Sequence, residues 1–464
     1  MGGGKSMWCA IYLCLLVVSG YAMAAGLARG ASRLEVAALT LCTGPAVMGF
    51  CLILLSMLGF RPSMPEILAI AAVFAAAGFA VRRFCRTAPA PKFVNSPTPP
   101  WLWIIFCSIG IAYGLMAVLK DALFYRVIEW DAFAIWQLKA KVLAIYPLHP
   151  RPPYFTDLSL SYSHLRYPLL APMISAGMHA MTGRLDDLGK TVSLLLYPGM
   201  GLAVFAVVRR INGLTAALTA TALLACLEPF CRYGGSGTAE MALTAFYACS
   251  LLCILRWRES RSAGFLVLAA IFSAWMAWTK NEGLALAAVN AIVVAASGPR
   301  EKRRQSLAAG ITLAAIVAFI YLPWIVYTWG IPRTDEDYAG RFASLQIFSN
   351  IGRIGSILIG FGKELIDWED WGLFWIIVAG LSLAERRRFR NSQVAAIGIL
   401  LALHVAAYVP AFLVTNWKLE ELLSVTLDRL LMHAAPAGAI LIGVLWPRWA
   451  GGMPTSQDAE IAGQ

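Results

Sequence analysis

Apolar runs of helix-spanning length recur along almost the whole of this chain. A helix needs roughly 17–25 mainly apolar residues to cross a bilayer. Thirteen segments approach that length, near 7–28, 35–58, 65–81, 101–119, 190–208, 213–230, 238–255, 264–279, 283–297, 307–328, 371–384, 394–414 and 428–446. Inside a bilayer a helix satisfies its own backbone polar groups. The sequence therefore predicts an all-α integral membrane protein, a polytopic bundle of about 13 transmembrane helices.

The composition excludes an ordinary soluble protein. Only 14% of the 464 residues are charged and 59% are hydrophobic, whereas soluble domains carry about 25% charged residues. Most of the ten cysteines lie within apolar runs, without the spacing of zinc ligands or of a disulfide framework. We expect them to act as small apolar packing residues.

Basic clusters between the spans predict the orientation. If the N-terminus is outside and the first span stays uncleaved, all of them fall on one side, which is the cytoplasm by the positive-inside rule. The clusters are Arg29/Arg33, Arg82/Arg83/Arg86, Arg209/Arg210, Arg256/Arg258/Arg261, Lys302/Arg303/Arg304 and Arg386/Arg387/Arg388/Arg390. The net charge of +12 is thus explained by orientation, and we expect no nucleic-acid partner.

Two long segments, 120–189 and 329–370, then lie outside the membrane. Both mix aromatic, charged and proline residues, and loops of this length in compact proteins are usually functional or disordered. The apolar stretch Tyr167–Met181 is short and contains prolines, so we expect it to lie in the outer interface or to re-enter. The inner side has a Pro/Thr/Ser-rich tether at 87–100 and no glycine-rich nucleotide loop.

The segment Val127–Lys141 contains the carboxylates most suited to chemistry. Glu129 and Asp131 follow the span at 101–119, so they emerge just above the membrane surface, beside tryptophans that favour this depth. Asp131 has two interpretations. It caps a helix by accepting backbone N–H bonds, or it is a catalytic base or metal ligand facing a polar cavity.

The order of these features resembles the GT-C glycosyltransferases, and most closely the bacterial branch with the aminoarabinose transferase of lipid A and the protein O-mannosyltransferases. An acidic residue and an interfacial helix in the first large outer loop carry this resemblance. So do His164-Leu-Arg-Tyr-Pro168, Leu227-Glu-Pro-Phe230, Trp278-Thr-Lys-Asn-Glu-Gly283 and Arg429-Leu-Leu-Met-His433. The sequence departs from the family where His-Pro-Pro becomes His-Leu-Arg-Tyr-Pro, and where the acidic pair is spaced Glu-Trp-Asp.

The resemblance covers roughly 101–446 and implies a domain organisation. Residues 1–100 would be extra N-terminal transmembrane helices with the cytoplasmic tether. Residues 101–446 would form a GT-C-like catalytic module with interfacial helices in its large first outer loop, and 447–464 would be a cytoplasmic tail.

The resemblance also implies roles for single residues. Asp131 or Glu129 would be the catalytic carboxylate, and the spacing leaves open which of them. Cations would neutralise the lipid phosphate as its charge grows, with Lys280 in the short turn between two spans as the best candidate. The other candidates are Arg232, Arg166 and Arg429.

Further polar residues have two interpretations each. Glu240, Glu282 and His164 are candidates for binding the sugar or the acceptor. Glu282 could instead form an ion pair with Lys280. Lys280 itself could be a lysine that anchors a helix end. The acidic runs Asp335–Asp337 and Asp367–Asp370 are expected to be solvated, with cation binding as the alternative. A divalent cofactor stays possible. His404 and His433 are expected to be packed, hydrogen-bonded residues.

The resemblance implies a hexosyl or pentosyl transferase. It would transfer a sugar from a polyprenyl-phosphate donor to a hydroxyl of a lipid, glycan or protein acceptor. The reaction would take place at the outer (periplasmic) face of the plasma (inner) membrane, where the protein contacts membrane lipids. The alternative is a transporter or lipid flippase. Transporters commonly have repeated halves with charges at the bilayer midplane. Here no repeat of the spans is visible, and the charges gather at the span ends.

Overall fold

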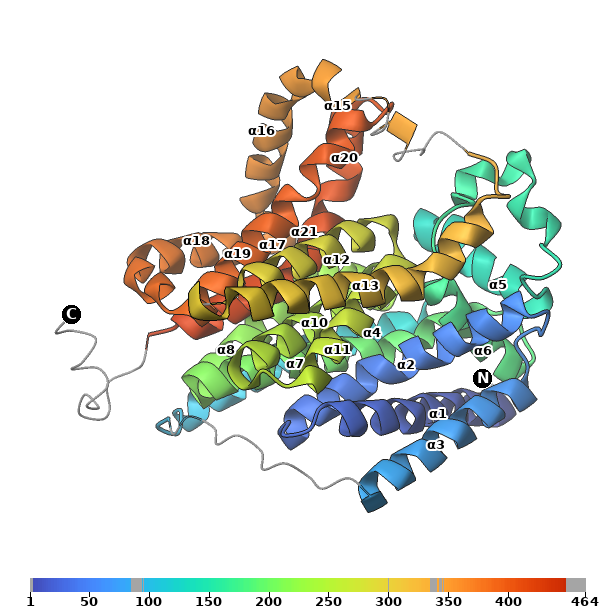
Figure 1. Cartoon of the computed structure of the whole chain (residues 1–464), viewed down its shortest axis with the longest axis horizontal. Coiled ribbons are helices and arrows are strands. Elements are labelled where there is room, and N and C mark those ends of the chain that lie inside the picture. The colour runs from blue at the N-terminus through green and yellow to red at the C-terminus, as the bar shows by residue number, and fades with distance from the viewer. Residues whose placement is uncertain are drawn as a thin grey trace.

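The computed structural model describes residues 3–84, 94, 96–298, 300–333, 340–341, 344 and 346–447. The acidic run Asp335–Asp337, most of the tether's first half (87–93 and 95) and the tail from 448 lie outside the described residues. All regular structure within these ranges is helical, which confirms the predicted all-α class (Figure 1).

Nine helical segments of the described chain are long and apolar enough to cross a membrane. They are α1 (Gly3–Leu27), α2 (Arg33–Met57), α3 (Met64–Phe84), α4 (Trp101–Phe124), η4 with α7 (Asp187–Val192 and Ser193–Asn212), α10 (Glu240–Ser260), α13 (Arg303–Thr328), α19 with α20 (Ser392–Ala406 and Val409–Val414) and α21 (Leu419–Leu445). These segments confirm a polytopic helical membrane protein.

Four shorter apolar helices occupy the remaining predicted spans: α8 (Leu214–Ala225), α11 (Ala263–Thr279), α12 (Asn281–Ala296) and α18 (Phe374–Ala384). All thirteen predicted segments are therefore helical, and the number that cross the bilayer stays a prediction. The stretch Tyr167–Met181 contains α6 (Leu170–Thr182), which has only 13 residues and is not among the spanning candidates.

The three N-terminal helices pack along one flank of the bundle (Figure 1). Helix α1 contacts both α2 and α3, and α2 also packs against α7 and α6. Small residues permit the closest approach: a Cβ on Gly44 of α2 would lie 1.9 Å from the carbonyl oxygen of Leu16 in α1. Close packing of this kind holds helices together where lipid removes the hydrophobic driving force between them.

A buried ion network at one end of the bundle ties these helices to the rest. Glu35 at the start of α2 lies 3.0 Å from Arg210 of α7 and 3.3 Å from Arg256 of α10. Both arginines also contact Glu259, at 3.1 and 3.0 Å. The Glu35 carboxylate further accepts the backbone N–H of Ser32 in a capping box. We call this the basic end.

The opposite end holds the segment from 125 to 192, and we call it the loop end (Figure 1). Its elements are η1 (Ala132–Gln137), α5 (Leu138–Ile145), η2 (Pro153–Phe155), η3 (Leu158–Ser163), α6 and η4. The other short elements of the chain are α9 (Glu228–Tyr233), η5 (Arg300–Lys302), α15 (Gln346–Ser349), η6 (Ile351–Arg353), α16 (Ile354–Leu365), α17 (Trp368–Trp371) and η7 (Arg386–Arg390).

Candidate active site

Five charged residues from distant parts of the chain form one continuous cluster. The Lys280 ammonium lies 3.0 Å from Glu240 and 3.2 Å from Glu282. Arg429 of α21 lies 3.7 Å from the same Glu240 oxygen, and its guanidinium donates to the Asp131 carboxylate. We call these five residues the charge cluster. It joins two predicted phosphate-binding cations to three of the predicted carboxylates.

Lys280 is held between two helices rather than in solvent. It has extended backbone angles between the end of α11 and the start of α12, and only 6% of its surface is exposed. Burial lowers the pKa of Lys280, but the Glu240 and Glu282 carboxylates raise it by more, so the pKa lies above its ordinary value. Lys280 does lie at a helix end, but its ammonium is buried and does not reach into solvent, and the predicted pairing with Glu282 is confirmed.

The turn before α10 positions Glu240, which is fully buried. Gly237 has a φ of +90°, a conformation that favours glycine. Gly235 allows close approach of α4, because a Cβ there would lie 2.6 Å from the carbonyl oxygen of Val118.

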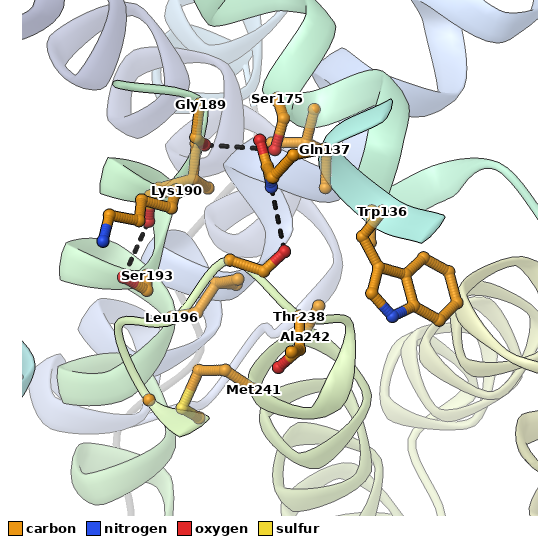
Figure 2. A pocket seen from close by; sticks show the side chains of 15 residues that line it. Trp136, Gln137, Ser175, Gly189, Lys190, Ser193, Leu196, Thr238, Met241 and Ala242 are labelled. Carbon is orange, nitrogen blue, oxygen red and sulfur yellow. Dashed lines mark hydrogen bonds between the residues drawn. The ribbon is translucent and has the colours of Figure 1, made fainter. Parts of the chain in front are cut away.

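The helix that carries Asp131 is fixed to this turn. The Gln137 side chain donates a 2.9 Å hydrogen bond to the carbonyl oxygen of Gly237, as Figure 2 shows. Trp136 and Gln137 line a cavity of about 40 Å³ at this junction, together with residues of α6, η4 and α10. The contacts couple the position of Asp131 to that of Glu240.

Asp131 does not cap a helix. It has helical backbone angles and its side chain makes no capping hydrogen bond, so the capping interpretation is wrong. The carboxylate instead pairs with Arg429 and keeps 30% of its side chain exposed. Glu129, two residues earlier, is half-buried, and its carboxylate forms no ion pair with a described residue. Of the two, only Asp131 joins the charge cluster.

Two buried oxygens of the charge cluster, and a ring nitrogen of His433 one turn after Arg429, have no hydrogen-bond partner among the described residues. They are Oε2 of Glu240, Oε2 of Glu282 and Nε2 of His433. Buried polar groups in folded proteins almost always have a partner, so such atoms call for a water or a ligand. Two carboxylate oxygens are thus free to accept hydroxyl groups.

A hydrogen-bonded group of three side chains lies within the bundle, and its His433 is one helical turn after Arg429 on α21. The Tyr408 hydroxyl lies 3.2 Å from Nδ1 of His433 and 2.7 Å from Nε2 of His404. Both histidines are fully buried, which confirms that they are packed and hydrogen-bonded. The role of Tyr408 was not predicted, because nothing in the sequence pairs it with two residues on different helices.

Arg232 belongs to a neighbouring ion group. It contacts Asp370 at 2.9 Å, and Asp428 and Glu228 at 3.5 Å each. Asp428 also accepts the backbone N–H of Arg429 at 2.7 Å, so this group adjoins the charge cluster.

Part of the acidic run Asp367–Asp370 is not solvated as expected. The Asp370 side chain is 16% exposed, because Arg232 draws it into an ion pair. Burial raises the pKa of Asp370, the Arg232 charge lowers it, and nearby Asp428 raises it again, so the net shift is upward. Asp367 instead caps α17 by accepting the backbone N–H groups of Glu369 and Asp370.

The remaining candidates lie in the segment before α6. Arg166 is half-buried, and no carboxylate among the described residues pairs with it. The His164 ring stacks on Tyr167 at 4.6 Å, and the His164 carbonyl oxygen accepts a hydrogen bond from Lys139. Arg166 is therefore the predicted phosphate-binding cation that is not neutralised within the described structure.

The described residues contain no group of three or more His, Cys, Asp or Glu side chains arranged to hold a metal ion. Asp131 has Arg429 as its charged neighbour.

Comparison with known proteins places part of the chain in a family context. Residues 166–327, which include α6 through α12 and nearly all of α13, match the family of dolichyl-phosphate-mannose-protein mannosyltransferases. No curated protein and no solved structure matches the chain. The matched segment contributes Lys280, Glu240 and Glu282 to the charge cluster, while Asp131 and Arg429 lie on either side of it in sequence.

The family match supports a GT-C-like glycosyltransferase, a class whose sugar donor is linked to a polyprenyl phosphate. The predicted resemblance is thereby confirmed. Together with the apolar helices, it supports an integral membrane glycosyltransferase.

Proposed function

We propose that this protein transfers a sugar from a polyprenyl phosphate to an acceptor hydroxyl, and that the reaction takes place at the charge cluster. The observation that carries the proposal is the continuous line of ion pairs from Asp131 to Glu282. The line ends at one side in a carboxylate that is 30% exposed. An exposed carboxylate held by a buried charged frame is suited to accept a proton from a bound substrate.

Asp131 acts as the general base in this proposal. As the acceptor oxygen forms its bond to the anomeric carbon, the hydroxyl proton passes to the Asp131 carboxylate. The bond between the anomeric carbon and the phosphate oxygen breaks, and the electron pair leaves with the polyprenyl phosphate. Arg429 orients the carboxylate by its direct ion pair. Positioned bases of this kind typically contribute 10²–10⁴-fold to a rate.

Arg166 receives the donor phosphate, because its charge is not already neutralised by a carboxylate in the described structure. Lys280 assists it. An ammonium group has three N–H donors, and the two carboxylates next to Lys280 leave one of them for a phosphate oxygen. Arg429 and Arg232 are engaged by carboxylates, so their main contribution is to hold the frame.

The free carboxylate oxygens of Glu240 and Glu282 accept hydroxyl groups of the sugar or acceptor. His164, at the same end of the bundle, offers a stacked ring to one of these substrates. We assign the loop end to the outer face of the inner membrane and the basic end to the cytoplasm, since the basic clusters gather there. Residues 101–446 then form the catalytic module, residues 1–100 an N-terminal addition, and 447–464 a cytoplasmic tail.

The test is a transfer assay with the purified protein. A polyprenyl-phosphate sugar and the matching nucleotide sugar are compared as donors, each as a panel of hexoses and pentoses, against lipid, glycan and peptide acceptors. We expect transfer from the lipid-linked donor alone. Efficient transfer from a nucleotide sugar, with no lipid carrier present, would overturn the proposal.

A further inference from the structure

An apolar groove of about 280 Å³ lies between the N-terminal helices and the family-matched part of the bundle. Helices α1, α2 and α3 form one wall, which includes Ala22, Phe50 and Phe74. Helices α11 and α13 form the other, with Trp275 and Ile320. All ten lining residues are uncharged and mainly hydrocarbon, so the groove fits a hydrocarbon chain. The family match assigns nothing to its first wall, which precedes residue 166.

The groove begins just below the charge cluster. Trp275 lies five residues before Lys280 on α11, about 7 Å along the helix axis at 1.5 Å per residue. The ring of Phe50 meets Trp278 edge to face at 5.6 Å, and Trp278 is two residues from Lys280. A chain lying in the groove therefore has its upper end within reach of the cluster.

A cation stands at the same end. It is Lys280, which follows Trp278 by two residues. Tyr321, next to Ile320 of the groove wall, is 6.0 Å from the Trp278 ring. The proposed function adds Arg166, the half-buried arginine that no described carboxylate neutralises. The groove thus combines an apolar wall with a positively charged end. This arrangement complements a single-chain lipid that has an anionic head group.

The head group has to supply the selectivity. Inside a bilayer a hydrocarbon chain gains no hydrophobic free energy by leaving lipid for an apolar groove, so packing and polar contacts decide what binds. An ordinary diacyl phospholipid has two hydrocarbon chains, and this single groove would accommodate only one of them. A polyprenyl phosphate brings one chain, and its phosphate meets Arg166.

We propose that this groove holds the first isoprene units of a polyprenyl phosphate, so that α1, α2 and α3 form half of the lipid-binding site. The proposal rests on the proposed function for the identity of the lipid. It gives the N-terminal helices a direct part in donor binding, where the sequence suggested only an addition to the catalytic module.

Photo-crosslinking in vesicles tests the occupant without requiring sugar transfer. The photoreactive residue p-benzoyl-phenylalanine replaces Phe74, which faces the groove, or Phe79, which is 72% exposed on the same helix and serves as the control. The full chain is reconstituted in phosphatidylethanolamine and phosphatidylglycerol with a few per cent of a long-chain polyprenyl phosphate. We expect adducts at Phe74 to be enriched in polyprenyl phosphate by roughly tenfold over adducts at Phe79. Equal capture at the two positions would overturn the proposal.

A steric variant connects the groove to catalysis. Ala77→Phe places a ring into the groove, and Ala75→Phe places the same ring on the opposite face of α3, where Ala75 is exposed. Because overpacking a filled site is costly, Ala77→Phe should raise the KM for a long-chain donor roughly tenfold. It should leave unchanged the KM for a donor whose phosphate carries a short alkyl group in place of the isoprene chain, and Ala75→Phe should change neither.

The two experiments separate this inference from the proposed function. Transfer from a lipid-linked sugar, with equal capture at Phe74 and Phe79 and a normal KM for Ala77→Phe, would place the chain elsewhere and leave the function intact. Selective capture of polyprenyl phosphate at Phe74, without any sugar transfer, would support the groove and overturn the function.

Discussion

Arg429 donates a hydrogen bond to the carboxylate of Asp131, a residue 298 positions earlier in the chain. The arginine lies in the last long helix, α21, and the aspartate in the first turn after α4. The sequence suggested separate roles for them, one as a base and the other as a phosphate ligand. The ion pair makes them parts of one unit, because Arg429 also lies 3.7 Å from Glu240.

Replacing the proposed base should abolish most activity and leave the fold intact. Asp131→Asn keeps a hydrogen-bond acceptor for Arg429 but cannot take up the proton. We expect kcat to fall by about 10²–10⁴-fold, with an unchanged melting temperature in detergent. Glu129→Gln is the matched control and should retain nearly full activity, because Glu129 stands outside the charge cluster. A nearly normal rate for Asp131→Asn would remove Asp131 from the catalytic role.

The pair Lys280–Glu240 should behave as a coupled unit in stability. Lys280→Met leaves the fully buried Glu240 short of a counter-charge, and breaking a buried pair costs about 3–5 kcal/mol. The double variant Lys280→Met/Glu240→Gln should recover part of this loss. Thermal unfolding of the single and double variants gives the coupling free energy. Purely additive losses would show that the two residues do not stabilise each other.

Arg166 should matter for the donor and not for the fold. We expect Arg166→Gln to raise the KM for the lipid-linked donor roughly 10–100-fold, the range lost with a charge-assisted hydrogen bond. The melting temperature should stay the same, since no described carboxylate pairs with Arg166. Arg184→Gln is the control at the same end of the bundle, because Arg184 is half-exposed. Equal effects of the two substitutions would argue for a general electrostatic influence.

Glu35 should be required for stability at the end remote from the reaction. Its carboxylate is 1% exposed and faces Arg210 and Arg256. Glu35→Gln leaves two buried guanidinium groups with Glu259 as their remaining charged partner, so we expect a loss of about 3–5 kcal/mol. The measurement is the melting temperature, together with the donor KM of the folded fraction. A change in KM without a change in stability would contradict the structural role.

Accessibility labelling checks the orientation. A cysteine introduced at Thr156, which is exposed at the loop end, should react with an impermeant thiol reagent in intact cells. One at Asn391, exposed beside the basic run Arg386–Arg390, should react only after permeabilisation. The parent chain supplies the baseline, because Cys14 and Cys226 are already exposed. The reverse pattern would move the charge cluster to the cytoplasmic face.

The helices were predictable because their signal is local. A run of apolar residues forms a helix in a bilayer whatever its neighbours are, and α4 and α13 both lie where the apolar runs near 101–119 and 307–328 placed them. The break at Lys280 was also visible, as a short polar turn between two apolar runs.

The pairing within the site was not predictable in the same way. Whether Asp131 caps a helix or meets an arginine depends on where α21 passes, and one sequence carries no record of that contact. Asp370 looked solvated for the same reason, since Arg232 lies 138 residues away. The groove depends on where α3 lies relative to α11 and α13, which apolar composition alone does not specify.

The network around Glu35 also sets an order of events during synthesis. Arg210 lies 175 residues after Glu35, and Arg256 follows on a later helix. A chain emerging from the ribosome therefore inserts α2 long before Arg210 and Arg256 are synthesised. Until then the Glu35 carboxylate lies unpaired at the water-exposed edge of the bilayer. Only when α10 arrives can it be sealed from solvent. A nascent chain that stops after α7 has Arg210 but lacks Arg256 and Glu259, so the network around Glu35 is complete only after the synthesis of α10, the helix that also carries Glu240.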